Sequence, residues 1–563
     1  MSRRTRRTLT AEVNALSPTD RLPAEVLAEI FLAVAQECLN NSNGRQRLQW
    51  IAVTHVSRRW RNTALSCGRL WCSIQSGDPA IREWLKRARG TALFVELKIG
   101  TTRDESTFNM VIRKLPQIQT LSIEISSSIR SETYDSLWPK IMGALSNPAP
   151  MLKSFRLDDR SFEQESPVTL LPDSAPLLRH LRLDGIHPTF PSLLLHNITN
   201  LSIHHPQPQL NPASVLVALA RMPLLECLTL ENAFVATSLN SIPATAPVHL
   251  AKLKAFNYRG LNFNLDITFL SHLSLNIDTR IMLLSCHLTA DLSLFSRLIE
   301  VHNRARDKAL DIRTLHLLWG DQALRLVISK QLPQSEAGAE ANCTSIKIVC
   351  PLLAGPFPTS WGEDLLRLPL SGLQHFSTNC NVGRGAWDVL SKRCTSLSLV
   401  SLADSASFSF IACLVDDYKQ NCPYVVQVLQ KESFHPTKAL PDDEIAKGVY
   451  HWDKPIFKSL GIIQLSQVNF EESGQPPLML VTLFFMALRE RADWCDPPVK
   501  MVWIRGCANF PSQTIKILKG KVTVCWDNIA FPKNQPKGIE EEQDPQAATE
   551  LGIDAGSVGS TST

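Results

Sequence analysis

Apolar side chains near the N-terminus recur at the spacing of one face of an α-helix. From residue 22 to residue 34 they are separated by three or four positions, which is the period of a helix and not of a strand. Pro23 suits the first helical turn, where its missing N–H costs no intrahelical hydrogen bond. We therefore predict a helix that begins near Pro23. Its apolar positions are Leu22, Val26, Leu27, Ile30, Phe31 and Val34.

A second apolar pattern predicts another helix over residues 49–65. Leu70 and Trp71 follow it closely. A segment this short cannot bury so many large apolar groups by itself, so some of them should face a partner or the next domain. The apolar side of this second helix consists of Trp50, Val53, Val56, Trp60 and Ala64.

The order of these residues resembles the F-box family. Residues 22–31 (LPAEVLAEIF) are similar to the family's opening helix, residues 53–61 (VTHVSRRWR) to its central helix, and Leu70 with Trp71 to its closing element. Ser57 stands where the family often has Cys. The long polar stretch between the two helices is similar to that of the fungal F-box-like branch.

The resemblance implies docking against a Skp-type adaptor, which bridges to a cullin–RING ubiquitin ligase. An apolar helical ridge would then lie in a groove of the adaptor. The alternative is that both helices only cap the following domain, which an amphipathic pattern alone does not exclude. The adaptor-binding residues predicted on this basis are Leu22, Pro23, Val26, Leu27, Ile30, Phe31, Val56 and Trp60.

After this segment, short leucine-rich strings return along the chain. Residues 115–123, 150–157 and 176–183 have the form Pro-x-Leu-x-x-Leu-x-Leu or a near variant. Successive copies are roughly 20–35 residues apart, which brackets the period of leucine-rich repeats. In such repeats alternate residues of a short strand point inward, and stacked units form a parallel sheet. Residues 211–221 and 290–301 have helical spacing and would lie outside that sheet.

The predicted fold class is α/β, with an N-terminal helical F-box followed by an irregular leucine-rich-repeat solenoid of parallel strands and outer helices. A less regular α/β domain with leucine-rich strands is the alternative. The predicted division is a disordered basic leader (1–17), the F-box-like domain (18–75), the repeat scaffold (76–531) and a disordered polar tail (532–563).

Composition and charge narrow the possible partners. The 563 residues are 44% hydrophobic and 20% charged, which is the range of globular proteins. A formal net charge of +5 gives no general reason to expect nucleic acid. The most apolar window, residues 478–488, is shorter than the ~20 residues that cross a bilayer, so it predicts a buried helix. We expect a cytoplasmic or nuclear protein that binds neither nucleic acid nor membrane.

No pattern of catalytic or cofactor-binding residues stands out. The sequence has no P-loop, nucleophile elbow or dinucleotide fingerprint, and its 14 cysteines lack zinc-site spacing. His204 and His205 precede Pro206, which favours a turn at the end of a repeat over a metal site. We therefore predict a receptor without catalytic activity, metal or cofactor that presents an unidentified target protein. The alternatives are an adaptor-independent interaction scaffold and an unrecognised hydrolase.

Overall fold

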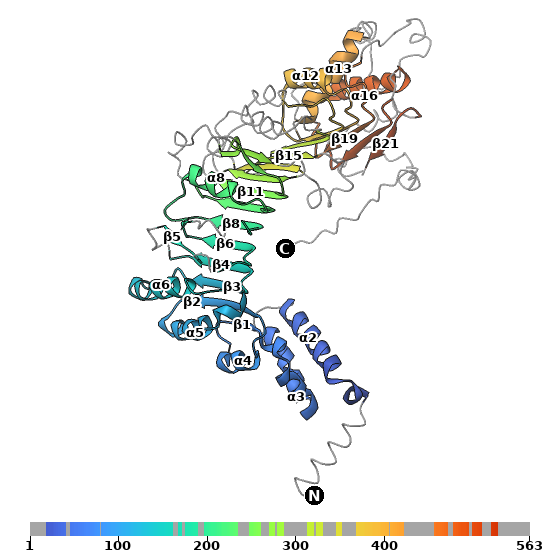
Figure 1. Cartoon of the computed structure of the whole chain (residues 1–563). Helices are drawn as coiled ribbons and strands as arrows, with labels where there is room; N and C mark the ends of the chain where they lie inside the picture. Colours follow the sequence, from blue (N-terminus) through green and yellow to red (C-terminus); the bar gives the residue numbers. More distant parts are fainter. Residues whose placement is uncertain are drawn as a thin grey trace. The chain divides into compact units, whose positions relative to one another are not determined.

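The structure, a computed structural model, consists of two compact units, Met1–Leu253 and Lys254–Thr563. Each is a mixed α/β unit whose sheet is mostly parallel (Figure 1). The predicted leader and tail lie outside the described residues. The structure describes residues 18–40, 46–78, 80–161, 167–171, 175–189, 196–234, 247–260, 269–275, 279–285, 312–319, 323–329, 345–351, 368–404, 406–421, 455–470, 477–494, 498–508 and 520–526.

Helical elements open the first unit. The first α-helix begins where the sequence predicted, and the carbonyl of Pro23 accepts a hydrogen bond from the Leu27 amide at 3.1 Å. The predicted helix over 49–65 is interrupted, because Ser57 is extended and its hydroxyl caps the next helix by accepting from the Trp60 amide at 3.1 Å. The α-helices are α2 (Ala24–Asn40) and α3 (Arg58–Ser66). The 3₁₀ helices are η1 (Pro18–Arg21), η2 (Gln46–His55) and η3 (Gly68–Trp71).

Seven parallel strands follow, each paired with the next in chain order. They are β1 (Ser73–Gln75), β2 (Leu93–Ile99), β3 (Ile118–Ile125), β4 (Ser154–Asp159), β6 (His180–Asp184), β8 (Asn200–His204) and β9 (Cys227–Glu231).

Helices line one side of the first of these strands (Figure 1). The β4–β6 and β6–β8 connections instead contain one short strand each, and these two strands pair with each other; the β8–β9 connection contains a helix. A helix is found where residues 211–221 predicted one, whereas residues 290–301 lie outside the described residues. The connecting elements are α4 (Ile81–Arg87), α5 (Thr102–Ile112), η4 (Leu115–Gln117), α6 (Ser131–Leu145), β5 (Val168–Thr169), β7 (Pro188–Thr189), α8 (Pro212–Ala220) and β10 (Val248–Leu250).

The leucine-rich strings form the core of this unit. All three apolar positions of the Leu-x-x-Leu-x-Leu motif are buried in each string. The second and third positions lie in the strand, and the first precedes the second by three residues. Parallel pairing places equivalent positions side by side, so the buried side chains stack from strand to strand. The stacked triplets are Ile118, Leu121 and Ile123; Leu152, Phe155 and Leu157; Leu178, Leu181 and Leu183; Ile198, Leu201 and Ile203; and Leu225, Leu228 and Leu230.

The turn after β6 requires glycine. Gly185 has φ +76°, and a Cβ added there would lie 2.0 Å from the carbonyl oxygen of Asp159. We expect Gly185→Ala to destabilise the chain by ~1–3 kcal/mol through strain and overlap. Gly143→Ala is the control, because this exposed helical glycine has open space around it and should gain up to ~1 kcal/mol. Denaturation midpoints measure both, and a neutral Gly185→Ala would contradict the assignment.

Strand β15 (Ala323–Ser329) is the exception to parallel pairing in the second unit, being antiparallel to both its neighbours. Only residues 320–322 connect it to β14, too few for a parallel crossover. From β11 to β21 the spatial order is β11 (Ala255–Gly260), β13 (Arg280–Ser285), β16 (Ser345–Pro351), β15, β14 (Thr314–Trp319), β17 (His375–Thr378), β18 (Leu399–Ala403), β19 (Ile462–Ser466), β20 (Met501–Arg505) and β21 (Thr523–Trp526); β12 is Leu273–Leu275.

Trp387 is the centre of the helical layer of this unit. Its ring lies 4.9 Å from that of Phe410 and 5.5 Å from that of Phe376, between centroids. The window predicted to be a buried helix lies in one, with Phe485 and Leu488 fully buried. No helix in the described ranges is long and apolar enough to span a membrane. The helices are α12 (Arg384–Arg393), α13 (Ala406–Asn421) and α16 (Pro477–Trp494).

Buried His375 makes the stability of the second unit depend on pH. Burial, and secondarily His316, lowers the pKa of His375 to about 3. As pH falls below about 6.5, the unfolded chain gains this proton while the folded chain does not. We expect the free energy of unfolding to fall by up to about 1.4 kcal/mol per pH unit between pH 6 and 4. In the His375→Gln variant, the free energy of unfolding, measured by denaturation at several pH values, should fall less per pH unit. An unchanged dependence on pH would contradict this expectation.

Candidate partner-binding site

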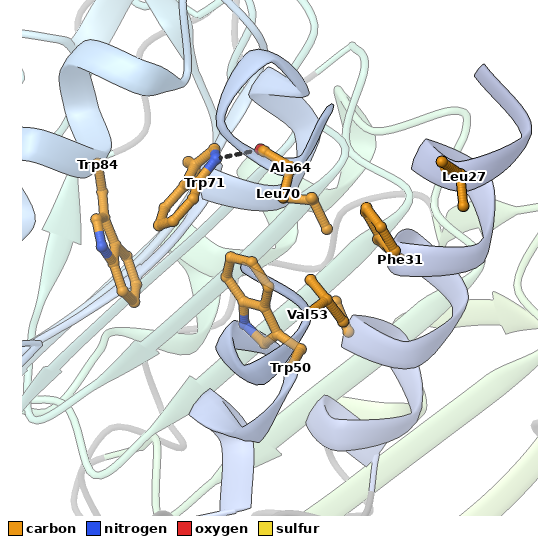
Figure 2. Packing of buried hydrophobic residues seen from close by; sticks show 9 residues of the cluster. Leu27, Phe31, Trp50, Val53, Ala64, Leu70, Trp71 and Trp84 are labelled. Carbon is orange, nitrogen blue, oxygen red and sulfur yellow. Dashed lines mark hydrogen bonds between the residues drawn. The ribbon is translucent and has the colours of Figure 1, made fainter. Parts of the chain in front are cut away.

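Three tryptophans hold the N-terminal helices against the start of the sheet. Trp71, from η3, lies between Trp50 of η2 and Trp84 of α4 (Figure 2). Its ring centroid is 5.0 Å from that of Trp50 and 5.8 Å from that of Trp84, and both pairs are edge-to-face. We call these three residues the tryptophan cluster. The sequence predicts that the F-box-like domain ends at residue 75. Trp84 lies beyond that boundary, so the core of the N-terminal helices continues into α4.

Polar contacts fix the tryptophan cluster in place. The indole N–H of Trp71 donates to the carbonyl of Ala64 at 2.9 Å, and the guanidinium of Arg87 lies 4.4 Å from the Trp71 ring. Arg47 forms a buried ion pair with Asp78, in the loop after β1. Burial raises the pKa of the Asp78 carboxyl despite its contacts with Arg47. These contacts tie η2 and η3 to the first strand, so the helices are held at a defined position.

One face of α2 packs into this core. Leu27 is 1% exposed and Phe31 is fully buried. The Phe31 ring lies 5.0 Å from that of Trp60, between centroids. The helical pattern predicts Leu27 and Phe31 on the partner-binding ridge, but their burial assigns them to the packing of the chain itself. The physical reason is that α2 is apolar on more than one side, and the tryptophan cluster covers one of them.

The other apolar face of α2 is open to solvent. Val26 is 43% and Ile30 is 42% exposed, one helical turn apart. Val56, in the bend before α3, is 59% exposed. Arg59 at the start of α3 donates to the carbonyl of Leu22, which brings this bend to the beginning of α2. We define the apolar patch as Val26, Ile30 and Val56 together with exposed Pro23.

The predicted partner-binding residues thus divide into three groups. Four form the apolar patch, Leu27 and Phe31 are buried, and Leu22 and Trp60 are half-buried and pack against the core. Charged side chains lie beside the patch, among them Glu29, whose carboxylate is paired with the Arg69 guanidinium at 2.8 Å on the surface. An apolar centre with a charged border is typical of protein interfaces.

No cluster of three His, Cys, Asp or Glu in the described part of the chain could hold a metal ion. Neither a model of a known protein family nor a curated protein matches this chain. The surface chemistry of the helices is therefore the guide to their role.

Substitutions on the two faces of α2 should affect stability differently. We expect Leu27→Ala to cost about 2–5 kcal/mol, because it leaves a cavity beside Phe31. Ile30→Ala should cost less than about 1 kcal/mol, because the side chain is already half in water. Thermal denaturation of both variants measures the difference. Equal losses would mean that the Ile30 face is also covered.

Proposed function

We propose that this chain is an F-box-like substrate receptor of a cullin–RING ubiquitin ligase. The N-terminal helices would dock a Skp-type adaptor, and the remainder would hold a target protein for ubiquitin transfer by the ligase. Such a receptor catalyses nothing itself and acts in the cytoplasm or nucleus. The main support is the exposed pair Val26 and Ile30, which follows the Leu-Pro element that resembles the opening of an F-box.

The exposure of the apolar patch favours docking over simple capping. If α2 only covered the following domain, both of its apolar sides would be expected to lie against the chain. Instead Leu27 is buried in the core that also contains the tryptophan cluster, while Val26 and Ile30 remain partly exposed to water. Two apolar side chains one turn apart fit the helix-in-groove mode of recognition. Completing the burial of a valine or isoleucine contributes up to about 1.5–3 kcal/mol before ordering costs.

We further propose that the buried triplets are irregular leucine-rich repeats that build a solenoid. Their support is the stacking of equivalent apolar positions along parallel strands, together with the return of the Leu-x-x-Leu-x-Leu string. Stacked units of this kind create extended binding surfaces. A receptor needs such a surface for its target, whereas an enzyme would need a site with convergent reactive groups.

Adaptor docking is tested by a pull-down of a purified Skp-type adaptor with the full chain. Ile30→Asp and Val26→Asp should each weaken adaptor binding at least about tenfold, since each places a charge in an apolar contact. Val217→Asp is the matched control: this valine of α8 is 59% exposed, and its replacement should leave binding unchanged. Leu27→Asp is unsuitable, because it would disrupt the core.

The outcomes distinguish a ligase receptor from an adaptor-independent interaction scaffold. Adaptor recovery that is equal for the unaltered chain, Ile30→Asp and Val26→Asp would contradict docking through the apolar patch. If the unaltered chain fails to bind the adaptor, the receptor proposal is contradicted and an adaptor-independent interaction scaffold is favoured. Thermal denaturation of every variant confirms that lost binding does not reflect lost folding.

A further inference from the structure

Two turns of the first unit carry the same sequence pattern. Residues 149–153 read APMLK and residues 175–179 read APLLR, so each has the order Ala, Pro, apolar residue, Leu, cation. In both turns the amide of this Leu donates to the carbonyl of the Ala at 3.1 Å. The turns lead into β4 and β6, which pair in parallel. Equivalent residues of the two turns therefore lie side by side.

Burial in the core accounts for the alanine and the leucine of this pattern but not for its other positions. The alanines and leucines of both turns are almost completely buried. The residue between proline and leucine faces solvent instead, since Met151 is 39% and Leu177 is 44% exposed, and both prolines are exposed as well. Single apolar side chains are ordinary on a protein surface, whereas adjacent ones indicate a candidate contact surface.

The cations of the two turns are also neighbours. The amide of Arg179 donates to the carbonyl of Lys153 at 2.8 Å, so the chain is already paired at this point. Lys153 is exposed, and Arg179 is half-buried, with its guanidinium donating to the carbonyl of Asn197 at 2.8 Å. Neither cation forms an ion pair with a carboxylate in the described part of the chain. Like charges on neighbouring strands repel, so a bound anion would relieve an unfavourable arrangement.

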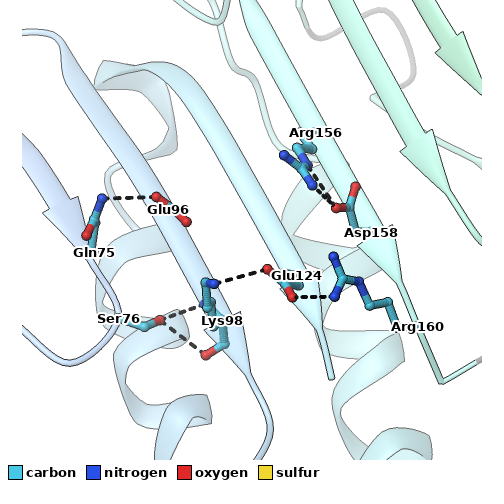
Figure 3. Close-up of polar contacts among 8 residues, drawn as sticks. All are labelled: Gln75, Ser76, Glu96, Lys98, Glu124, Arg156, Asp158 and Arg160. Atoms are coloured by element: carbon cyan, nitrogen blue, oxygen red, sulfur yellow. Dashed lines mark hydrogen bonds and ion pairs between the residues drawn. The ribbon is translucent and has the colours of Figure 1, made fainter. Parts of the chain in front are cut away.

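Cations further along these strands do have counter-charges (Figure 3). The carboxylate of Glu124 lies 3.4 Å from Lys98 Nζ and 3.3 Å from Arg160 Nη1. On β4, Arg156 Nε donates to the carboxylate of Asp158 at 2.8 Å. The missing counter-charge is therefore a feature of the two turns and not of the whole strands.

We propose that these two turns bind an acidic segment of a partner protein. Carboxylates of the segment pair with Lys153 and Arg179, and its apolar side chains cover Met151 and Leu177. The prolines restrict both turns, which lowers the cost of ordering them on binding. We call the site the turn surface, and it consists of Pro150, Met151, Lys153, Pro176, Leu177 and Arg179.

The chemistry of the turn surface favours an acidic protein over a nucleic acid. Phosphates also pair with cations, but single-stranded nucleic acids are held largely by stacking on aromatic side chains, and the turn surface has none. A sugar–phosphate backbone also has no apolar side chain that could cover Met151 and Leu177. That the acidic segment belongs to the target of the receptor rests on the proposed function. Binding itself requires neither α2 nor an adaptor.

Fluorescence anisotropy of the full chain with the peptide fluorescein-Gly-Asp-Glu-Leu-Asp-Glu-Leu-Asp-amide tests the turn surface. An analogue with Asn and Gln in place of Asp and Glu should bind at least about tenfold more weakly, because it lacks the carboxylates. An analogue with Ser in place of Leu should also bind more weakly, because it buries less apolar surface. No binding of the acidic peptide, or equal affinity for either analogue, would overturn the proposal.

Substitutions show whether the acidic peptide binds at the turn surface. Lys153→Glu should weaken binding at least about tenfold, because it replaces attraction by repulsion, and Leu177→Ser at least about threefold. The matched controls are Lys86→Glu in α4 and Val217→Ser in α8, which make similar changes at other exposed positions and should leave binding unchanged. Unchanged affinity in Lys153→Glu would place the peptide elsewhere and contradict the proposal.

Lys153→Glu also has a readout without ligand. The new carboxylate lies beside Arg179, so the thermal denaturation midpoint should not fall. A lower midpoint would mean that Lys153 serves the fold instead of a partner. A labelled single-stranded RNA that binds more tightly than the acidic peptide, and loses affinity in Lys153→Glu, would overturn the assignment to a protein.

The turn surface and adaptor docking are tested separately. Adaptor recovery by Lys153→Glu should equal that of the unaltered chain, and Ile30→Asp should bind the acidic peptide normally. Loss of peptide binding with normal adaptor recovery is therefore specific to the turn surface. An unaltered chain that recovers the adaptor but does not bind the acidic peptide would overturn the turn surface alone.

Discussion

The register of the parallel strands is the constraint on which the first unit depends. A slip of one residue between β4 and β6 would turn Leu181 and Leu183 away from the core and bring Arg182 into it. The register is fixed because the strands from β3 to β9 carry buried apolar residues at the same two positions, with a third buried apolar residue three positions earlier. The same alignment places the residue after each string in one row. The strand register therefore determines both the buried core and this row of polar residues.

A feature of this structure can be predicted from the sequence when the residues that determine it are neighbours in the chain or form a repeating motif. The start of α2 was predicted because it depends on neighbouring residues, namely Pro23 and the apolar positions that follow. The inward leucines were predicted because the motif repeats. The division of α2 into two apolar faces was not, since Leu27 and Ile30 are equally apolar. Residues about 20 to 45 positions further along the chain, among them Trp50, Trp60 and Trp71, determine which face is covered.

In two places a local feature of the chain overrides the structure that the sequence pattern predicts. Residues 49–65 have a helical pattern, but Ser57 ends one element and caps the next, which leaves Val56 in an exposed bend. The short connection between β14 and β15 forces antiparallel pairing inside an otherwise parallel arrangement. A pattern of apolar residues gives the type of element, whereas capping groups and connection lengths decide where it ends and in which direction the chain returns.

The continuous strand pairing from β1 to β9 has a consequence for a receptor. The tryptophan cluster joins α2 to β1 through η3 and α4, and parallel pairs then lead through β4 to β8 without interruption. The apolar patch and strands β1 to β8 therefore belong to one packed unit. A receptor must hold its target at a fixed distance from the ligase, because a loosely tethered target would spend little time near the transferred ubiquitin. A stack of paired strands meets this requirement better than a flexible linker, whose ends vary in separation.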